Sequence, residues 1–473
     1  MNKKTKIVAT LGPASDSREM MSKLSIAGVN VFRINFSHAN YENVKRIVSE
    51  IRAMNADLGH NVAILADLQG PKLRVGNMGH GVALKVDDTF IFTTNECEGS
   101  QERAYMTYKK FPEDVKVGEK ILVDDGKMSF EVIETNGIDE VKTKVLVEGI
   151  LHSKKGVNLP NTNISQPALT KKDIKDAKFA IGLEVDWIAL SFVRSAQDIK
   201  KLKNLIKKNS DYKIPIIAKI EKPEAVRNIN EIVHACDGLM VARGDLGVEI
   251  PMEEVPLIQK MLVDKAKSAR IPVIIATQMM ETMIENPVPT RAEVNDVANS
   301  IMDGADAVML SGETSVGKYP IKVIDQMRKI IEKVENSPRI SVPQKAPHIR
   351  TKRYMTKSIC YHAALMANDV EAKAIQTLTN TGYTAFQISA WRPNANILAY
   401  TSNRRILSRL NLLWGVKAFY YNENKSTDDT VQDLEVIAKQ EGYVEESDMV
   451  ITLSSMPVQE HGMVNTLRLT EIK

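Results

Sequence analysis

The chain contains little cysteine, and the cysteines it has follow no functional pattern. Its 473 residues include only Cys97, Cys236 and Cys360, which are far apart and odd in number. Their spacing indicates neither a disulfide framework nor a zinc site. We therefore expect reduced thiols and a cytoplasmic protein.

Long apolar runs and a strong charge of one sign are also lacking. No segment approaches the apolar length of a transmembrane helix, and Gly12 and Pro13 interrupt the short apolar stretch near the start. The 63 basic and 59 acidic residues leave a net charge of +4, with no dense block of Lys or Arg. We expect neither a membrane nor a nucleic acid as a partner.

Several well-known catalytic signatures are missing. The sequence has no GxxxxGK[ST] phosphate loop, no GxSxG elbow, no GxGxxG turn and no protein-kinase signature. A dinucleotide cofactor is therefore not expected. Any chemistry on phosphates must use residues arranged in another way.

Apolar strand-like runs alternating with amphipathic helical stretches dominate most of the chain. Eight runs precede helical stretches, at residues 6–12, 30–38, 61–70, 186–193, 214–221, 238–247, 271–279 and 306–312. Eight strand–helix units are the number in a (β/α)8 TIM barrel, so we predict an α/β barrel. An open doubly wound sheet is the alternative.

This pattern is interrupted between about residues 72 and 166. Alternating short strands occur there, as in residues 119–134 (EKILVDDGKMSFEVIE), and the DDG and NG turns favour hairpins. We predict a small all-β lid at residues 72–166, inserted between two parts of the barrel, 1–71 and 167–340.

A Pro-rich segment, SPRISVPQKAP, follows the last barrel helix and indicates a linker. Beyond it we predict a C-terminal α/β domain of regulatory type at residues 341–473. Its expected strands are residues 373–379 (KAIQTLT), 385–391 (AFQISAW), 396–402 (NILAYTS), 416–422 (VKAFYYN) and 449–455 (MVITLSS).

Polar residues collect at one end of nearly every expected barrel strand. They are Thr10, Arg33, Asn35, Ser37, His38, Asp67, Ser191, Lys219, Glu221, Gly244, Asp245, Thr277, Ser311 and Glu313. A single Ser or Thr at such a place is usually a loop cap. Eight strand ends together indicate an active site at one mouth of the barrel.

The types of these residues favour chemistry on a phosphate with a metal ion. Glu221 and Asp245 supply carboxylate oxygens on neighbouring strands, and Mg²⁺ usually takes one or two protein carboxylates plus substrate oxygens. Lys219 and Arg33 supply positive charge for a phosphoryl group. The residues alone leave phosphoryl transfer, enolisation and aldol cleavage open.

Longer motifs narrow this choice. Ten motifs follow one another from residue 5 to about 335: TKIVATLGPAS, RINFSHA, LADLQGPKLRVG, SKKGVNLP, LSFVRS, AKIEKPE, VARGDLGVEIP, ATQMMETM, PTRAEVNDVANSI and MLSGETSVGKYP. Together, and in this order, they resemble the pyruvate kinase family. The resemblance implies a phosphotransferase of glycolysis that converts phosphoenolpyruvate and ADP to pyruvate and ATP. The barrel, the inserted lid and the C-terminal domain agree with that family.

The resemblance also implies roles for single residues at the strand ends. Lys219 is similar to the lysine that stabilises the phosphoryl group in transit. Glu221 and Asp245 match the ligands of Mg²⁺, for which Mn²⁺ is an alternative. Gly244, Asp245 and Thr277 match the positions that hold the phosphoenolpyruvate carboxylate and the metal, and Thr277 is also a candidate for a proton relay.

Substrate and nucleotide contacts are implied in the same way. Arg33 matches the residue that grips the substrate phosphate, and Arg74 and Lys155 match contacts to the nucleotide phosphates. His38 and Asn35 are further candidates for nucleotide binding. Because Lys155 lies at the end of the lid, closure of the lid would bring it to the substrate.

A monovalent-cation site is implied by Asn35, Ser37, Asp67 and the carbonyl of Leu68. Many family members carry TKGPE where this chain has LQGPK, ending at Lys72. The glutamate form is associated with a K⁺ requirement. The Lys72 ammonium would replace the charge of the ion, so we predict activity without added K⁺.

In the C-terminal domain, the TNTGYT turn resembles the effector-phosphate loop of the family. Its candidate residues are Thr379, Thr381, Gly382 and Thr384, because amides and hydroxyls at a helix start can hold a phosphate. A plain glycine turn is the alternative. The resemblance also implies a homotetramer.

Two other functions are alternatives. A different barrel enzyme on phosphoenolpyruvate or a keto acid would have no use for a nucleotide-binding lid carrying Lys155. A catalytically impaired protein on the same scaffold would not need to keep together the residues Lys219, Glu221, Asp245, Arg33 and Thr277.

Overall fold

The structure is a computed structural model that describes residues 3–337, 353–423, 425–455 and 463–473. Eight parallel strands form a closed barrel: β1 (Lys6–Thr10), β2 (Val31–Asn35), β3 (Ala63–Asp67), β13 (Trp187–Leu190), β14 (Ile216–Ile220), β15 (Gly238–Ala242), β16 (Val273–Ala276) and β17 (Ala307–Leu310). The predicted TIM barrel is confirmed and the open sheet is excluded.

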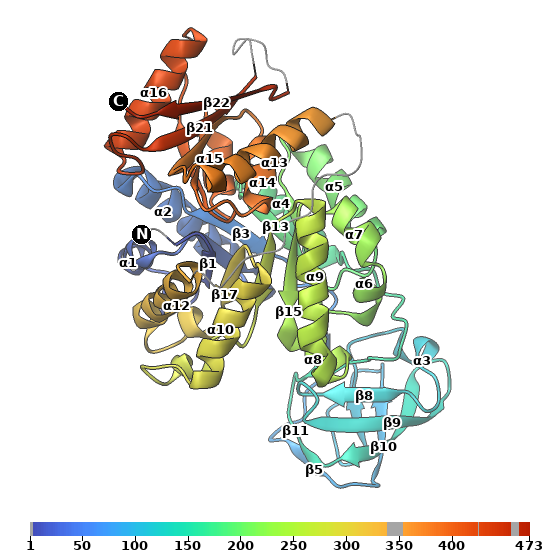
Figure 1. Cartoon of the computed structure of the whole chain (residues 1–473). Helices are drawn as coiled ribbons and strands as arrows, with labels where there is room; N and C mark the ends of the chain where they lie inside the picture. The colour runs from blue at the N-terminus through green and yellow to red at the C-terminus, as the bar shows by residue number, and fades with distance from the viewer. Residues whose placement is uncertain (1–2, 338–352, 424, 456–462) are drawn as a thin grey trace.

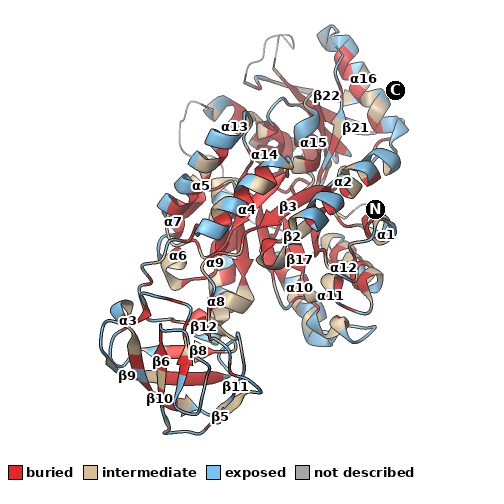
Figure 2. Ribbon diagram, turned by 180° about the vertical axis from the view of Figure 1, so that it is seen from behind, coloured by how far each residue is buried: buried red, intermediate tan, exposed pale blue. Residues whose placement is uncertain are grey.

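Helices surround the barrel on the outside, which is why its strands are buried on both faces (Figure 2). They are α1 (Arg18–Ala27), α2 (Tyr41–Leu58), α4 (Lys171–Gly182), α5 (Ala196–Asn209), α6 (Pro223–Arg227), α7 (Ile229–Ala235), α8 (Arg243–Glu249), α9 (Val255–Ala269), α10 (Arg291–Asp303), α11 (Gly312–Ser315) and α12 (Pro320–Glu335). Capping boxes start three of them, at Thr170 with Asp173, at Ser195 with Asp198 and at Thr290 with Glu293.

The interior of the barrel is filled with side chains. Every second residue of a strand points inward, as Val8, Leu65 and Met240 do. Leu412 of the C-terminal domain joins this cluster, and the indole of Trp187 at the start of β13 donates to the carbonyl of Arg409 at 3.2 Å. The C-terminal domain therefore closes the amino end of the barrel.

The inserted segment forms a separate β domain with its own core. Its elements are β4 (Leu73–Arg74), β5 (Val82–Leu84), β6 (Thr89–Thr93), β7 (Arg103–Tyr105), α3 (Phe111–Asp114), β8 (Lys120–Val123), β9 (Met128–Thr135), β10 (Glu140–Val147), β11 (Gly149–Leu151) and β12 (Gly156–Asn158). Phe90, Phe92 and Phe130 pack edge to face or tilted inside it. The predicted hairpins form, because the DDG turn joins β8 to β9 and the NG turn joins β9 to β10.

The C-terminal domain is an α/β domain with a five-stranded sheet of order β20-β19-β18-β21-β22. Its elements are α13 (Tyr354–Asp369), β18 (Ala374–Leu378), α14 (Tyr383–Ala390), β19 (Asn396–Thr401), α15 (Arg404–Leu410), β20 (Val416–Tyr420), α16 (Thr427–Gln440), β21 (Met449–Ser454) and β22 (Thr466–Glu471). The predicted domain boundary at residues 340 and 341 lies outside the described residues.

One expected strand of this domain is wrong. The AFQISAW segment lies in helix α14, not in the sheet. Gly382 begins this helix with φ of 82°, and Ala385, Ile388 and Trp391, spaced as on a helix face, pack in the domain core. A short apolar run fits a strand as well as a buried helix, and only packing separates the two. The antiparallel edge strand β22 was not predicted.

The lid and the C-terminal domain lie at opposite ends of the barrel (Figure 1). On the lid side, the Asn158 amide at the end of β12 donates to Glu249 of α8 at 2.8 Å. Lys222 also donates to Glu249, at 2.5 Å. Helix α8 follows β15, so the lid is joined to the barrel at the carboxyl ends of the strands. No helix among the described residues is long and apolar enough to cross a membrane.

Candidate active site

Lys219 lies at the centre of a cluster at the carboxyl ends of the barrel strands. Its Nζ is 3.2 Å from Oδ1 of Asp67 and 3.0 Å from Oε1 of Glu221, and it donates to Oγ of Ser191 at 2.7 Å. Strands β3, β13 and β14 are neighbours in the barrel, which is why residues far apart in sequence meet here. The Lys219 side chain is 11% exposed, so its charge depends on these partners.

The charges of this cluster stabilise one another. Burial lowers the pKa of Lys219, but the carboxylates of Asp67 and Glu221 outweigh burial and raise that pKa above the usual lysine value. Burial raises the pKa of Asp67, but the charges of Lys219 and Arg33 outweigh it and hold that pKa below its usual value. The ammonium and the Asp67 carboxylate are therefore both charged.

Arg33 shares Asp67 with Lys219. Its Nε lies 2.6 Å from Oδ2 of Asp67, and its Nη1 donates to Oγ1 of Thr10 at 3.0 Å. Arg33 is in β2, directly beside β3. One buried carboxylate therefore holds two cations at the mouth of the barrel, a geometry suited to an anion with several oxygens.

Glu221 and Asp245 lie close enough to influence each other. Burial and then the negative charge of Asp245 raise the pKa of Glu221, although Lys219 opposes this. The backbone N–H of Phe192 donates to Oε2 of Glu221 at 2.6 Å. A divalent cation would relieve this repulsion, so the two carboxylates fit the predicted metal. The described residues contain no group of three or more His, Cys, Asp or Glu suited to a metal ion, so substrate oxygens would complete the shell.

Thr277 and Gly244 meet just beyond the carboxyl ends of the neighbouring strands β16 and β15. Oγ1 of Thr277 accepts from the Gly244 N–H at 2.7 Å and donates to the Ala276 carbonyl at 2.6 Å. Thr277 has φ of 69°, a strained value for a β-branched residue. Arg243 donates to the Thr277 carbonyl at 2.7 Å and is held by both oxygens of Asp296, at 2.6 and 2.7 Å. This brace offsets the strain and fixes the Thr277 hydroxyl.

The residues predicted for the monovalent cation lie at the ends of β2 and β3, where Asn35 pairs with Asp67 in the strand register. The Leu68 carbonyl accepts from Ser191 at 2.7 Å, which places it beside Asp67 and Lys219. The side chain of Asn35 accepts from the Ser37 N–H at 3.1 Å and so caps a short helix. Ser37 is half-buried, and the side chain of His38 lies outside the described part of the chain.

Lys72 is exposed at the hinge of the lid. It lines a small cavity between lid and barrel that Asp245 and Phe192 also line. Lys72 therefore borders the same cavity as Asp245, with its side chain exposed.

Arg74 and Lys155 lie side by side on the lid, where β4 pairs with β12. The Arg74 guanidinium donates to the Lys154 carbonyl at 2.8 Å, and Lys155 pairs with Asp124 at 2.9 Å. Their partners belong to the lid, so the structure does not join these two residues to the Lys219 cluster.

The TNTGYT turn lies in the C-terminal domain, far from Lys219. Oγ1 of Thr379 accepts from the Gly382 N–H at 3.0 Å, and Oγ1 of Thr381 accepts from the Tyr383 N–H at 3.5 Å. Thr379, Thr381, Tyr383 and Thr384 line a cavity of about 810 Å³. The loop therefore borders a space large enough for a small ligand.

Two residues that support the site were not predicted to do so from the sequence. Ser191 was noted only as a strand end, yet it joins Lys219 to the Leu68 carbonyl. Arg243 was not singled out, although an arginine directly after a buried strand was a usable signal. The fold and the cluster define a (β/α)8-barrel enzyme with its reactive groups at the carboxyl ends of the strands.

Comparison with known proteins identifies the family. Residues 2–324 match the model of the pyruvate kinase barrel domain, and residues 357–470 match that of the pyruvate kinase alpha/beta domain. The chain belongs to the pyruvate kinase family.

Individual relatives support this assignment over the full length. A pyruvate kinase of Geobacillus stearothermophilus is 43% identical over 99% of this chain and 80% of its own length. A pyruvate kinase of Mycobacterium intracellulare is 42% identical over 100% of this chain and 99% of its own length. The crystal structure of a pyruvate kinase from Cryptosporidium parvum has a TM-score of 0.91 and 33% identity, covering 100% of this chain and 96% of that one.

Proposed function

We propose that this chain transfers the phosphoryl group of phosphoenolpyruvate to ADP, which yields pyruvate and ATP. The observation that carries the proposal is the Lys219 ammonium, held between Asp67 and Glu221 at the mouth of the barrel. A phosphoryl group in transit carries negative charge on its oxygens, and fixed cations stabilise it. Arg33, on the other side of Asp67, would bind the same phosphate.

Glu221 and Asp245 would hold Mg²⁺ or Mn²⁺ together with substrate oxygens. When bound, the divalent ion would supply positive charge for the enolate that remains after transfer. The Gly244 region would hold the substrate carboxylate. Thr277 is our candidate for passing a proton to carbon through water, and its hydroxyl would first have to leave the Ala276 carbonyl.

The nucleotide is proposed to bind between barrel and lid. Arg74 in β4 and Lys155 directly before β12 present two positive charges on the lid. Lys155 would exchange Asp124 for the phosphates when the lid closes. Closure would also exclude water, which protects the phosphoryl group from hydrolysis.

Further properties are proposed by family resemblance. Lys72 would stand in for K⁺, and the cavity beside Thr381 would take a phosphorylated effector. A homotetramer is proposed because α10 exposes Val294 and Met302, which would be covered by another subunit. The three cysteines are free thiols, as expected for a protein of the reducing cytoplasm.

The test is a coupled assay of ADP-dependent pyruvate formation with the wild type and Lys219→Met. We expect turnover to fall by about a thousandfold or more in the variant, as when a main stabilising group of a transition state is removed. Binding of phosphoenolpyruvate, measured by calorimetry, should persist. Lys201→Met, an exposed lysine of α5, is the matched control. Near-normal turnover in Lys219→Met, or an inactive wild type, would refute the proposal.

A further inference from the structure

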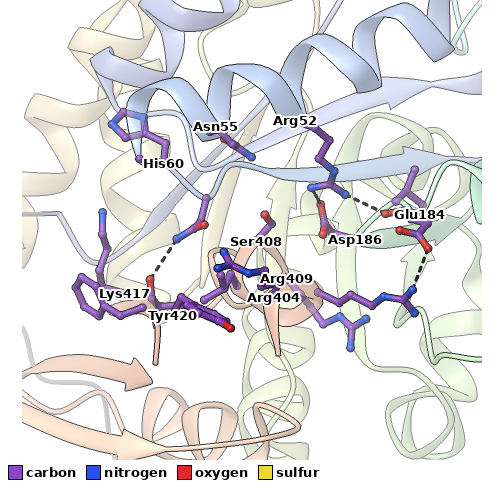
Figure 3. Close-up of a pocket in the computed structure, with 18 of the residues that line it drawn as sticks. Arg52, Asn55, His60, Glu184, Asp186, Arg404, Ser408, Arg409, Lys417 and Tyr420 are labelled. Atoms are coloured by element: carbon purple, nitrogen blue, oxygen red, sulfur yellow. Dashed lines mark hydrogen bonds and ion pairs between the residues drawn. The ribbon is translucent and has the colours of Figure 1, made fainter. Parts of the chain in front are cut away.

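A second large cavity lies at the opposite end of the barrel from Lys219, at the junction with the C-terminal domain. Its volume is about 640 Å³. It is bounded by the end of α2, the segment before β13, helix α15 and strand β20 (Figure 3). We refer to it as the junction cavity. Its volume is in the range that holds small molecules.

Some of the charges that line the junction cavity are already paired. Arg52 lies 3.0 Å from Asp186 and also donates to the Glu184 carbonyl at 2.9 Å. Arg405 lies 3.2 Å from the Glu184 carboxylate. These contacts pair two arginines with two carboxylates, so together they contribute no net charge to the cavity.

Three further cations are not neutralised. Within the described ranges, Arg404, Arg409 and Lys417 form no ion pair with a carboxylate, and the remaining acidic group of the lining is Glu441. The cavity therefore has an excess of two positive charges. All three cations belong to the C-terminal domain, on one side of the space (Figure 3).

The geometry of two of these cations is suited to an incoming anion. The guanidinium of Arg404 lies over the Tyr420 ring, 3.6 Å from its centroid, which orients the plane without using its donors. Arg409 donates one hydrogen bond to the Lys213 carbonyl at 2.8 Å, but its Nε is buried without a partner. A buried donor left unpaired is costly.

Burial at the junction cavity shifts the pKa of two titratable groups. Burial lowers the pKa of Arg409, despite the opposing charges of Asp186 and Asp237. Burial, and then the charge of Lys417, lower the pKa of His60 at the end of α2. The Lys417 contribution to the His60 shift is the one expected beside a positive charge, whereas the Arg409 shift follows from burial.

We propose that the junction cavity binds a compact organic dianion, a phosphate monoester or a dicarboxylate, through Arg404, Arg409 and Lys417. Arginine forks match the paired oxygens of either group. The site is distinct from the Lys219 cluster, because it lies at the amino ends of β3 and β13. It is also distinct from the TNTGYT loop, which borders a different cavity.

The test is isothermal titration calorimetry of the full chain with two probes, glycerol 3-phosphate and succinate. We expect at least one of them to bind the wild type with saturation. Arg404→Gln and Lys417→Gln, both at exposed positions, should each weaken that binding at least tenfold, as when a charge-assisted hydrogen bond is lost. The stronger probe distinguishes the phosphate ester from the dicarboxylate.

Two controls locate the effect. Arg46→Gln removes an arginine of α2 that pairs with Asp16 and Glu50 away from the cavity, so it should leave the affinity unchanged. Thr381→Ala alters the other phosphate candidate and should also leave it unchanged. Equal affinity in Arg404→Gln, Lys417→Gln and the wild type, or no saturable binding of either probe to the wild type, would overturn the proposal.

Discussion

Asp67 and Lys219 form a buried ion pair with 3.2 Å between Oδ1 and Nζ, and the second oxygen of Asp67 holds Arg33. The Asp67 side chain is 1% exposed. Two cations that would repel each other are therefore kept together by one carboxylate. This arrangement makes Asp67 a positioning residue for both, although it need not touch the substrate.

Asp67→Asn should lower both stability and activity. Removing one partner of a buried pair leaves uncompensated charge, at a cost of about 3–5 kcal/mol. We expect a lower melting temperature and a fall of at least tenfold in kcat/KM for phosphoenolpyruvate. Asp57→Asn is the control, because its pair with Arg18 is exposed and worth about 0–1 kcal/mol. Wild-type kinetics in Asp67→Asn would contradict this role.

Arg243→Lys should impair turnover through Thr277. Lysine cannot reproduce the two contacts to Asp296 together with the bond to the Thr277 carbonyl. We expect kcat to fall by about tenfold, since a misplaced hydroxyl transfers protons poorly. Steady-state kinetics would measure this, with Arg291→Lys at an exposed position of α10 as control. A change in KM alone would mean that Arg243 supports binding only.

Glu293 should stabilise the protein in a pH-dependent way. Its carboxylate accepts from the Thr282 N–H and hydroxyl at 2.7 and 2.6 Å and from the Thr290 N–H at 2.8 Å. Burial raises its pKa, but these hydrogen bonds outweigh burial and hold the pKa below the usual 4.5. The stabilisation is therefore complete above pH 4.5 and is lost as the pH falls through the lowered pKa.

Glu293→Gln tests this stabilisation. We expect it to cost about 1–2 kcal/mol of unfolding free energy at neutral pH, the worth of hydrogen bonds to a charged group. The difference from the wild type should shrink at pH values below 4.5. Melting curves across pH would measure both, and Glu285→Gln, from an exposed pair with Lys318, should show little effect at any pH. A difference that does not change with pH would argue against the charged form as the cause.

Lys72 should make the enzyme independent of K⁺. It lines the hinge cavity that Asp245 also lines, so its ammonium would supply positive charge beside the proposed substrate site. We expect activity in buffers free of Na⁺ and K⁺, and we expect Lys72→Glu to lose most of that activity and regain it with K⁺. Strong activation of the wild type by K⁺ would contradict this prediction.

Much of the barrel was predictable because the pattern of apolar residues that marks each strand and helix is local in the sequence. Each buried parallel strand is a continuous apolar run, and each outer helix has one apolar face, so the eight units could be counted in the sequence. The lid hairpins were predictable for the same reason, because the DDG and NG turns limit the backbone locally. Helix α14 was not, because the AFQISAW run is too short for its period to separate helix from strand.

The sequence by itself determined the order of strands and helices and the polar residues that end each strand, since these depend on side-chain chemistry and spacing along the chain. Only the tertiary structure decided which of those residues share a contact. Closing the barrel brings β3 beside β13, which pairs with β14 in turn, so Asp67 reaches Lys219 from one side and Arg33 of β2 from the other. The junction cavity also depends on tertiary structure, because its walls come from domains that meet only when the chain folds.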